Sequence, residues 1–315
     1  MLENCIITSG RANIPLARKI AEHCGVPYTE INFKNFGDGD WKPKFPETIR
    51  GLTVIIVQPT NPIAGKHMGE HLYELLVISD AAMRASAKEV IAVIPYFGGA
   101  RQDRKDEPRV PITARLNADL ITNAGIKKVI TLDLHVDQIQ GFFNIPVDNL
   151  YGSTCFVPII EQMALPNSAA SSADVGGARR SEAYAKYFEI PLIICYKSKV
   201  DGIIEKLIPL GDLQGKNIWL LDDIVDSAKT ITIAADAMLE RGAASVRACC
   251  SHGVFSGNSQ ERIDKSGITA FYVLDTIQFE KKSEKIQILS SAPLFGEAIK
   301  EHMTPGGSIS KLFFF

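Results

Sequence analysis

The sequence predicts an α/β protein in which mainly parallel sheets are flanked by helices. Short apolar runs rich in β-branched residues, such as residues 53–58 and 89–96, alternate with longer segments of helical period. The runs are apolar at nearly every position, which is typical of strands buried on both faces. This alternation stops near Leu150 and then starts again, so we expect two domains, residues 1–149 and residues 150–315.

The first half contains the strands and helices of one such layered domain. We expect strands at residues 53–58, 89–96 and 127–134, and helices at residues 67–84 and 113–123. Pro111 precedes the second helix, and Thr113 is a candidate for its N-cap because its hydroxyl oxygen can accept a backbone N–H.

The second half repeats the pattern with one local departure. We expect strands at residues 190–196, 217–223, 245–253 and 269–275. Residues 167–173 are small and polar where the alternation requires another buried strand. The pattern is therefore expected to be interrupted there, with weaker support for the loop that follows.

Composition and targeting signals exclude several classes of function. Of the 315 residues, 46% are hydrophobic and 22% are charged, and the net charge is -2, so no general attraction to nucleic acid or to an anionic membrane is expected. The six cysteines form no CxxC pair, which favours reduced thiols over a disulfide or a zinc site. Neither a secretion signal nor an apolar run of about 20 residues is found, so we expect a cytoplasmic protein without a membrane partner.

Two adjacent aspartates end the strand at residues 217–223, and a turn with hydroxyl groups follows. The polar residues are Asp222, Asp223, Asp226, Ser227 and Thr230. Backbone N–H groups at the start of a helix bind anions and hydroxyls add donors, whereas carboxylates suit the hydroxyl groups of a sugar. The pattern favours a sugar-phosphate site; a helix N-cap with acidic residues near the helix dipole is the alternative.

A basic loop follows the strand at residues 89–96. Its charged and amide groups are Arg101, Gln102, Asp103, Arg104, Lys105 and Arg109. Planar guanidinium groups suit phosphate oxygens, and a glutamine or an aspartate can recognise an adenine edge. The alternative is a charged loop that is only solvated.

Other polar residues at strand ends complete the candidates. By the period of two, Asp133 and His135 lie on one side of a strand and can hold Mg²⁺ or orient a nucleotide, although a lone histidine is more often structural. Asp174 precedes paired glycines that let the backbone approach a ligand. Lys197 and Lys199 stand at a strand exit, where ordinary surface lysines are the alternative.

These motifs, taken together and in this order, resemble the ribose-phosphate pyrophosphokinase family, also called the phosphoribosyl pyrophosphate (PRPP) synthetases. The segments that carry the resemblance are "FGDGD", "VIPYFGGARQDRK", "DLHVDQIQGFF", "DVGGARR", "YKSK" and "DDIVDSAKTI". The resemblance extends over nearly the whole chain. It implies two phosphoribosyltransferase-like domains, ATP and ribose 5-phosphate as substrates, Mg²⁺ as cofactor, and a homo-oligomer, hexameric in the common class.

The resemblance also implies a role for each matching position. The residues implied to hold the adenosine end of ATP are Phe36, Asp38, Asp40, Arg101, Gln102 and Asp103. His135 and Asp174 are implied to serve the metal and the phosphates, and Lys197 and Lys199 to be catalytic cations on a closing loop. The residues implied to bind ribose 5-phosphate are Asp222, Asp223, Asp226, Ser227, Ala228, Lys229 and Thr230.

The implied reaction is attack of the ribose C1 hydroxyl on the β-phosphorus of ATP, with AMP as leaving group. Such a transfer needs little covalent participation by the protein. Positioning, metal charge and closing cations are therefore expected to supply most of the rate.

Several positions depart from the family pattern. They are Gly37 in place of proline, Asp40 in place of glutamate, Lys199 in place of arginine, Ser227 in place of threonine and Lys229 in place of glycine. Glycine at position 229 permits a positive φ or a close approach to phosphate, so Lys229 is expected either to strain or block the turn, or to add a positive charge to the anion. The first outcome favours a non-catalytic homologue that regulates or assembles with an active partner; the second favours an active enzyme and is our prediction. A phosphoribosyltransferase that consumes PRPP is a third hypothesis.

Overall fold

The computed structural model describes residues 2, 4–61, 67–200 and 203–315. For residues 197–200 and 203–206 it describes the backbone alone. The chain divides into two compact units. The first comprises Met1–Tyr151, Thr276–Gln278 and Ser290–Phe313. The second comprises Gly152–Asp275, Phe279–Leu289 and Phe314–Phe315.

The first unit is built on a six-stranded sheet in which every pair of neighbours is parallel. In spatial order its strands are β2 (Tyr28–Thr29), β1 (Cys5–Ser9), β5 (Thr53–Val57), β6 (Glu89–Ile94), β7 (Lys128–Leu132) and β8 (Val147–Leu150). All five residues of β5 are buried, because both faces of this central strand are covered.

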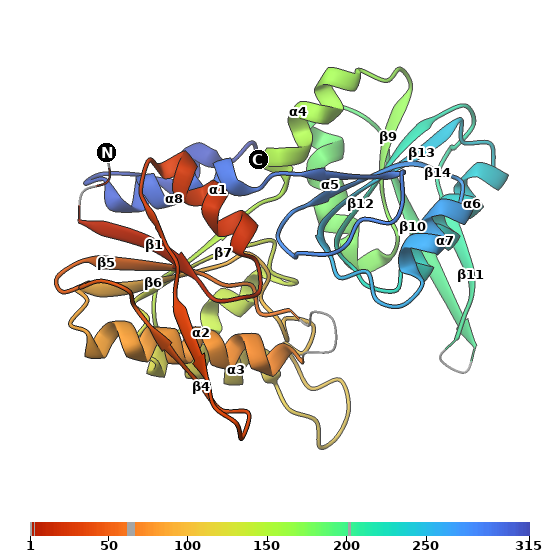
Figure 1. Cartoon of the computed structure of the whole chain (residues 1–315). Coiled ribbons are helices and arrows are strands. Elements are labelled where there is room, and N and C mark those ends of the chain that lie inside the picture. The colour runs from red at the N-terminus through yellow and green to blue at the C-terminus, as the bar shows by residue number, and fades with distance from the viewer. Residues whose placement is uncertain (1, 3, 62–66, 201–202) are drawn as a thin grey trace. The chain divides into compact units, whose positions relative to one another are not determined.

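Helices cover both faces of this sheet. They are α1 (Ile14–Cys24), α2 (Met68–Arg84), α3 (Thr113–Asn123) and α8 (Ala292–Met303), with the 3-10 helices η1 (Asp137–Phe142) and η3 (Ile309–Leu312). Figure 1 shows α1 and α8 on one face and α2 and α3 on the other. The C-terminal α8 packs on α1, where Cys24 Sγ lies 3.6 Å from the carbonyl oxygen of Gly296 and His23 Nε2 lies 2.7 Å from Glu297 Oε1.

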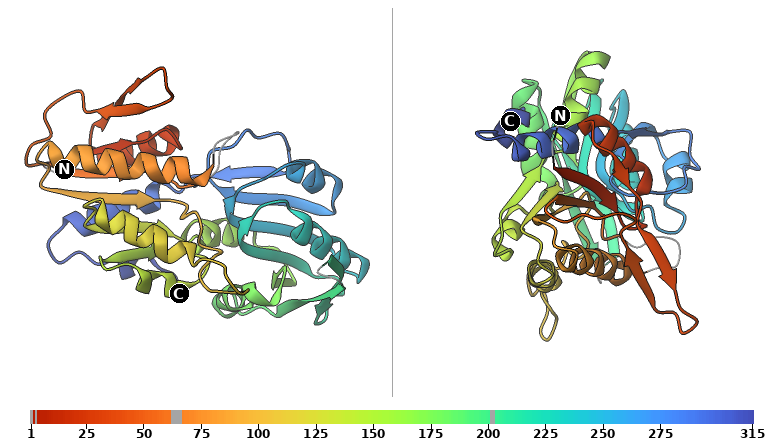
Figure 2. Two further views of the ribbon diagram at one scale, coloured as in Figure 1. Left: turned by 90° about the horizontal axis from the view of Figure 1, so that it is seen from below. Right: turned by 60° about the vertical axis from the view of Figure 1, so that its left-hand side comes forward.

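A small antiparallel hairpin belongs to the first unit but not to its sheet. It consists of β3 (Asn32–Asn35) and β4 (Trp41–Lys44), which form a two-stranded sheet. Figures 1 and 2 show the hairpin projecting away from the six-stranded sheet. Its tip, residues 36–40, is exposed.

The second unit contains a seven-stranded sheet. In spatial order its strands are β11 (Ile203–Leu210), β10 (Leu192–Val200), β9 (Ser168–Ser172), β12 (Asn217–Val225), β13 (Ser245–Gly253), β14 (Ile268–Leu274) and β15 (Ile286–Leu289). Only the β10–β11 pair within this sheet is antiparallel. The helices are α4 (Ser153–Met163), α5 (Ala178–Tyr187), α6 (Lys229–Glu240) and α7 (Ser259–Lys265), with the 3-10 helix η2 (Val175–Gly177).

The expected interruption at residues 167–173 is wrong, because Ser168–Ser172 forms β9, a central strand between β10 and β12. Its small residues allow close packing by the next segment: a Cβ added at Gly177 would lie 3.0 Å from Ser172 Cβ. The serine hydroxyls donate to backbone carbonyls, including Ser172 Oγ to the carbonyl oxygen of Asp174 at 2.6 Å. Backbone pairing and tight packing, rather than bulky apolar side chains, therefore make this strand.

The other predicted elements are confirmed, with small shifts of their bounds. The α/β class with parallel sheets in both units also matches the prediction. Thr113 is not the N-cap of α3, since Ile112 occupies that position and the Thr113 hydroxyl hydrogen-bonds Gln102 Oε1. In the part of the chain that is described, no helix is both long enough and apolar enough to cross a membrane.

Candidate active site

The paired aspartates lie near the carboxyl end of β12. Asp222 is opposite Cys250 of the neighbouring strand β13, and the strand continues to Val225. Asp223 is 6% exposed, whereas Asp222 is partly exposed. The strand thus holds two adjacent carboxylates that are close enough to interact with each other.

Asp223 is paired with a cation that the sequence did not single out. Arg180 Nη1, from α5, lies 3.2 Å from Asp223 Oδ1. Its side chain is 23% exposed and that of Asp223 is 8% exposed, so the pair is largely removed from water. An ion pair in such a place is sensitive to loss of either partner, because the remaining charge stays desolvated.

Asp222 has a different environment. Its Oδ1 accepts a hydrogen bond from the backbone N–H of Asp223 at 2.9 Å. Burial raises the pKa of Asp222 well above its ordinary value, and the negative charge of Asp223 adds to the effect. Asp174 also raises the pKa of Asp222, and Arg180 lowers it, so these four groups form one electrostatic cluster in the second unit.

Asp174 begins the 3-10 helix η2. Its Oδ1 accepts a hydrogen bond from Gly177 N at 3.1 Å, which caps η2. A Cβ at Gly176 would lie 3.1 Å from that same Asp174 Oδ1. The paired glycines thus allow close packing, Gly176 against the Asp174 carboxylate and Gly177 against Ser172.

The turn after β12 leads directly into α6. Ala228 has φ 60° and ψ 3°, the left-handed conformation, and Lys229 is the first residue of the helix. Lys229 is not among the residues with positive φ, and it is exposed. The turn therefore requires no positive φ at position 229; the conformation that favours glycine is one residue earlier, at Ala228.

Contacts from other elements hold this turn. Arg262 Nη1, from α7, donates to the carbonyl oxygen of Ser227 at 2.7 Å, and the N–H of Ser256 donates to that of Asp226 at 3.1 Å. These bonds tie the turn to α7 and to the segment after β13 through its backbone carbonyls. Arg262 is a second functional candidate that sequence patterns did not reveal.

The adenosine-side candidates of the hairpin are at its exposed tip. Phe36 is 41% exposed, and its N–H donates to the carbonyl oxygen of Asp40 at 2.8 Å. Asp38 Oδ1 accepts from Asp40 N at 3.0 Å, so the two carboxylates are ordered within the tip. Lys34 and Lys42 place their ammonium groups 5.4 and 5.9 Å from the centre of the Phe36 ring. A Cβ at Gly37 would meet no atom within 4 Å, so close packing does not require glycine at this position.

The loop with the remaining adenosine-side candidates is anchored at its base. Gly98 N donates to Thr60 Oγ1 at 2.7 Å, and Asn117 Nδ2 donates to the carbonyl oxygen of Gly98 at 2.9 Å. Beyond this base Arg101 and Gln102 are exposed and Asp103 is partly exposed. Hydrogen bonds thus fix the base of the loop, and its polar side chains beyond Gly98 face solvent.

Strand β7 ends earlier than expected. It stops at Leu132, because Asp133 takes φ 40° and leaves the strand. The expectation that Asp133 and His135 share one side of a strand is therefore wrong: Asp133 is buried and His135 is exposed. His135 is in the first unit and Asp174 in the second, so their joint role at a metal stays a prediction.

The two lysines that the family resemblance implies to be catalytic, Lys197 and Lys199, belong to strand β10. Lys197 is opposite Leu207 of β11, and Lys199 is opposite Ile204. Their side chains are outside the described residues. Their predicted role is therefore also untested.

Comparison with known proteins identifies the family. Residues 5–125 match the model of the N-terminal domain of ribose phosphate pyrophosphokinase, and residues 167–314 match that of the phosphoribosyl synthetase-associated domain. A ribose-phosphate pyrophosphokinase of Porphyromonas gingivalis is 48% identical, covering 99% of this chain and 98% of the relative. Another, of Wolinella succinogenes, is 43% identical, covering 98% of each chain.

A solved structure supports the same assignment. The crystal structure of phosphoribosylpyrophosphate synthetase from Mycobacterium smegmatis matches with a TM-score of 0.87 and 32% sequence identity, covering 95% of this chain and 99% of that one. Both units thus have a counterpart in one known enzyme. The chain belongs to the ribose-phosphate pyrophosphokinase family.

Proposed function

We propose that the chain transfers the pyrophosphoryl group of ATP to the C1 hydroxyl of ribose 5-phosphate, giving PRPP and AMP. As a family member it is a ribose-phosphate pyrophosphokinase, a transferase of nucleotide biosynthesis. The observation that carries the proposal is the pair Asp222 and Asp223 at the end of β12, directly before the turn into α6. Carboxylates beside a helix N-terminus match a ligand that has both sugar hydroxyls and a phosphate.

On the ribose side, each group has a distinct task. Asp223, oriented by Arg180, accepts hydrogen bonds from ribose hydroxyls. The hydroxyls of Ser227 and Thr230 and the backbone N–H groups at the start of α6 bind the 5-phosphate. Lys229 adds a positive charge beside the anion, and Asp226 and Ala228 shape the turn.

On the ATP side, the hairpin and the basic loop of the first unit share the nucleotide. Phe36 stacks on adenine, a contact that is worth roughly 1–3 kcal/mol for a base on an aromatic ring. Asp38, Asp40, Gln102 and Asp103 recognise polar edges of adenosine. Arg101 binds phosphate oxygens through a charge-assisted hydrogen bond.

Mg²⁺ is the proposed cofactor. The family is of the kinase type, and Asp174 offers a hard oxygen ligand within a cluster of carboxylates that a divalent cation would neutralise. Among the described residues no group of three metal-binding side chains occurs, which suits an ion held by one or two protein ligands and by substrate phosphates. When bound, the ion neutralises charge on the phosphates; Asp174 and His135 are the residues that would hold it.

Positioning dominates the proposed mechanism. The ribose site fixes the C1 hydroxyl, and no residue needs to act as a strong base. Lys197 and Lys199 meet the negative charge that develops on the transferring group, so they stabilise the transition state more than the bound substrates. We further propose a homo-oligomer, hexameric as in the common class of the family, located in the cytoplasm.

The experiment that tests this function is a product assay. Purified protein is incubated with ATP, ribose 5-phosphate and Mg²⁺, and phosphorus NMR follows AMP and PRPP. Equal amounts of the two products are expected. ADP in place of AMP, or no product under conditions where both substrates bind, would contradict the proposal.

A further inference from the structure

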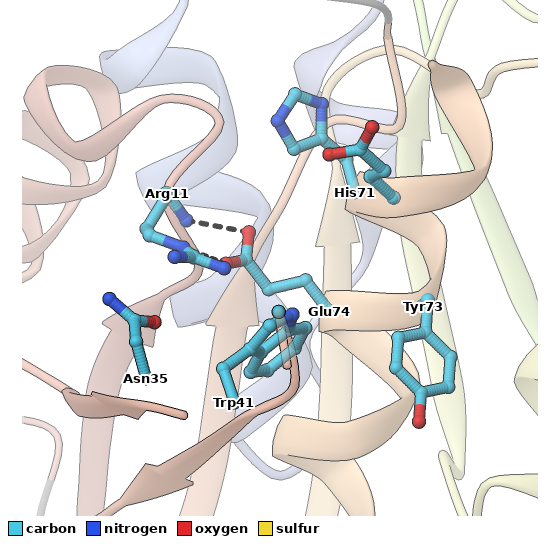
Figure 3. A pocket seen from close by; sticks show the side chains of 8 residues that line it. Arg11, Asn35, Trp41, His71, Tyr73 and Glu74 are labelled. Carbon is cyan, nitrogen blue, oxygen red and sulfur yellow. Dashed lines mark hydrogen bonds and ion pairs between the residues drawn. The ribbon is translucent and has the colours of Figure 1, made fainter. Parts of the chain in front are cut away.

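A pocket of about 280 Å³ separates the β3–β4 hairpin from helix α2 (Figure 3). Its wall includes Trp41 and Asn35 from the hairpin, and Tyr73 and Glu74 from α2. Arg11, which follows β1, reaches into the same pocket. Three segments that are distant in sequence therefore meet beside the tip end of the hairpin, where Asn35 pairs with Trp41.

Glu74 supplies a buried charge at this junction. Its side chain is 2% exposed. Its carboxylate accepts hydrogen bonds from Arg11 Nε, from the backbone N–H of Arg11 at 2.9 Å and from Gln58 Nε2 at 2.7 Å. Because three donors converge on it, the carboxylate is fixed in place and fixes Arg11 in turn.

The other side of the Arg11 guanidinium faces the hairpin. Its central carbon lies 4.5 Å from the centre of the Phe33 ring and 5.0 Å from that of Trp41. Asn35 pairs with Trp41 across the hairpin, and Phe33 is two residues before Asn35, so the two rings share one face. One guanidinium group thus joins a buried carboxylate of α2 to the aromatic face of the hairpin.

We infer that Arg11 is a positioning residue that holds the β3–β4 hairpin in the orientation needed to bind ATP. The inference rests on the proposed function, in which Phe36 at the hairpin tip stacks on adenine. A two-stranded hairpin is marginally stable by itself, so its orientation depends on packing of its aromatic face against the rest of the unit. The planar guanidinium is suited to this task because it can pair with a carboxylate and stack on rings together, which an ammonium cannot do.

The test compares Arg11→Lys with the native protein. The lysine keeps a cation for Glu74 but loses the planar stack, so the fold is retained while the hairpin is released. We expect KM for ATP to rise about 3- to 10-fold, with kcat and KM for ribose 5-phosphate unchanged. Trp41 emission should shift to longer wavelength; the second tryptophan, Trp219, is 2% exposed and far less sensitive to solvent.

Two further variants serve as controls. Arg18→Lys changes an arginine of the same unit that also stacks on a ring, Tyr28 at 5.2 Å, and pairs with Glu30, but away from the hairpin. It should leave both KM values unchanged. Arg11→Gln combined with Glu74→Gln removes both charges and leaves no buried carboxylate unpaired, and it should reproduce the effect of Arg11→Lys.

Phe36→Ala separates the two ideas that the test combines. If Phe36→Ala raises KM for ATP while Arg11→Lys leaves that KM and the Trp41 emission at native values, the inference about Arg11 is wrong and the proposed function stands. If Phe36→Ala leaves KM for ATP unchanged, the hairpin does not bind adenine and the inference about Arg11 is wrong, whereas the reaction itself is decided by the product assay. A uniform loss of kcat and of both affinities in Arg11→Lys would assign Arg11 a purely structural role and overturn the inference.

Discussion

The two parts of the proposed site are built in opposite ways. The ribose-side turn, residues 222–230, continues a central buried strand and is held by Arg180 and Arg262. The adenosine-side hairpin, β3–β4, projects from its unit and presents an exposed Phe36 at the tip. The first region is preorganised by the core of its sheet, whereas the second depends on the contact between Arg11 and its aromatic face. Mutations in the ribose-side turn should therefore reduce ligand affinity strongly and locally. Mutations at the hairpin should change its orientation and have smaller effects on affinity.

The largest effect is expected at the core of the ribose-side turn. Asp223→Ala removes a carboxylate acceptor together with its ion pair to Arg180, so ribose 5-phosphate affinity should fall about 10- to 150-fold, equivalent to about 1.5–3 kcal/mol. Calorimetry with each ligand separately checks this, and nucleotide affinity should stay nearly native. Asp212→Ala, at an exposed carboxylate of the same unit, is the matched control. Equal loss of both ligands would remove the distinction between the two regions.

On the adenosine side, Arg101→Ala should raise KM for ATP by about tenfold or more, because a charge-assisted donor to phosphate is lost. Ribose 5-phosphate KM should not move. Arg104→Ala, in the same exposed loop, should have a smaller effect. An unchanged KM for ATP in Arg101→Ala would show that this loop does not contact the nucleotide.

The rigid construction of the ribose-side turn should also be visible in stability. The folded-state pKa of Asp222 is raised, so the folded protein binds its proton more tightly than the unfolded chain does. Stability contributed by this proton is present at low pH and is lost as pH rises from the unfolded value, about 3.9, through the raised folded value. Asparagine carries no charge at neutral pH, so Asp222→Asn avoids the stability that the native protein loses when Asp222 ionises. At neutral pH the variant should have a free energy of unfolding about 0.5–2 kcal/mol larger than the native protein, with reduced activity. Denaturant melts at several pH values check the sign; a destabilised variant at neutral pH would contradict it.

The smallest effect is expected at Ala228. Glycine adopts the left-handed conformation of position 228 without strain, which stabilises the folded state of Ala228→Gly by about 1 kcal/mol. Glycine also gives the unfolded chain more conformational freedom, which destabilises the fold by about the same amount. The change in unfolding free energy should therefore be below about 1 kcal/mol, with ribose 5-phosphate affinity within a few-fold of native. A large gain in affinity would mean that the turn is distorted by its alanine.

The sequence predicted the parallel α/β class, most strands and helices and the family, because apolar periodicity and local motifs carry that information. The prediction was wrong where tertiary packing, rather than the local pattern, determines the structure. Small residues form the buried strand β9 because η2 and α5 approach it closely, and Asp133 ends β7 early through a positive φ. Neither feature has an apolar pattern.

Ion pairs between residues from distant segments could not be predicted from the sequence either. Arg180 meets Asp223 across 43 positions, and Arg11 meets Glu74 across 63. Only the fold brings such groups together. The helix α8 likewise returns to pack on α1, which a linear division into consecutive domains does not anticipate.

The central claim is that the ribose-side turn works with lysine at position 229. Lys229 begins α6 without a positive φ and its side chain is exposed, so the backbone conformation does not require glycine there. The direct measurement is turnover of ATP and ribose 5-phosphate to AMP and PRPP by the native protein beside Lys229→Gly. The account predicts that the native protein turns over, and that Lys229→Gly has equal or weaker affinity for ribose 5-phosphate because a positive charge is lost. A silent native protein that glycine restores to activity would contradict the account.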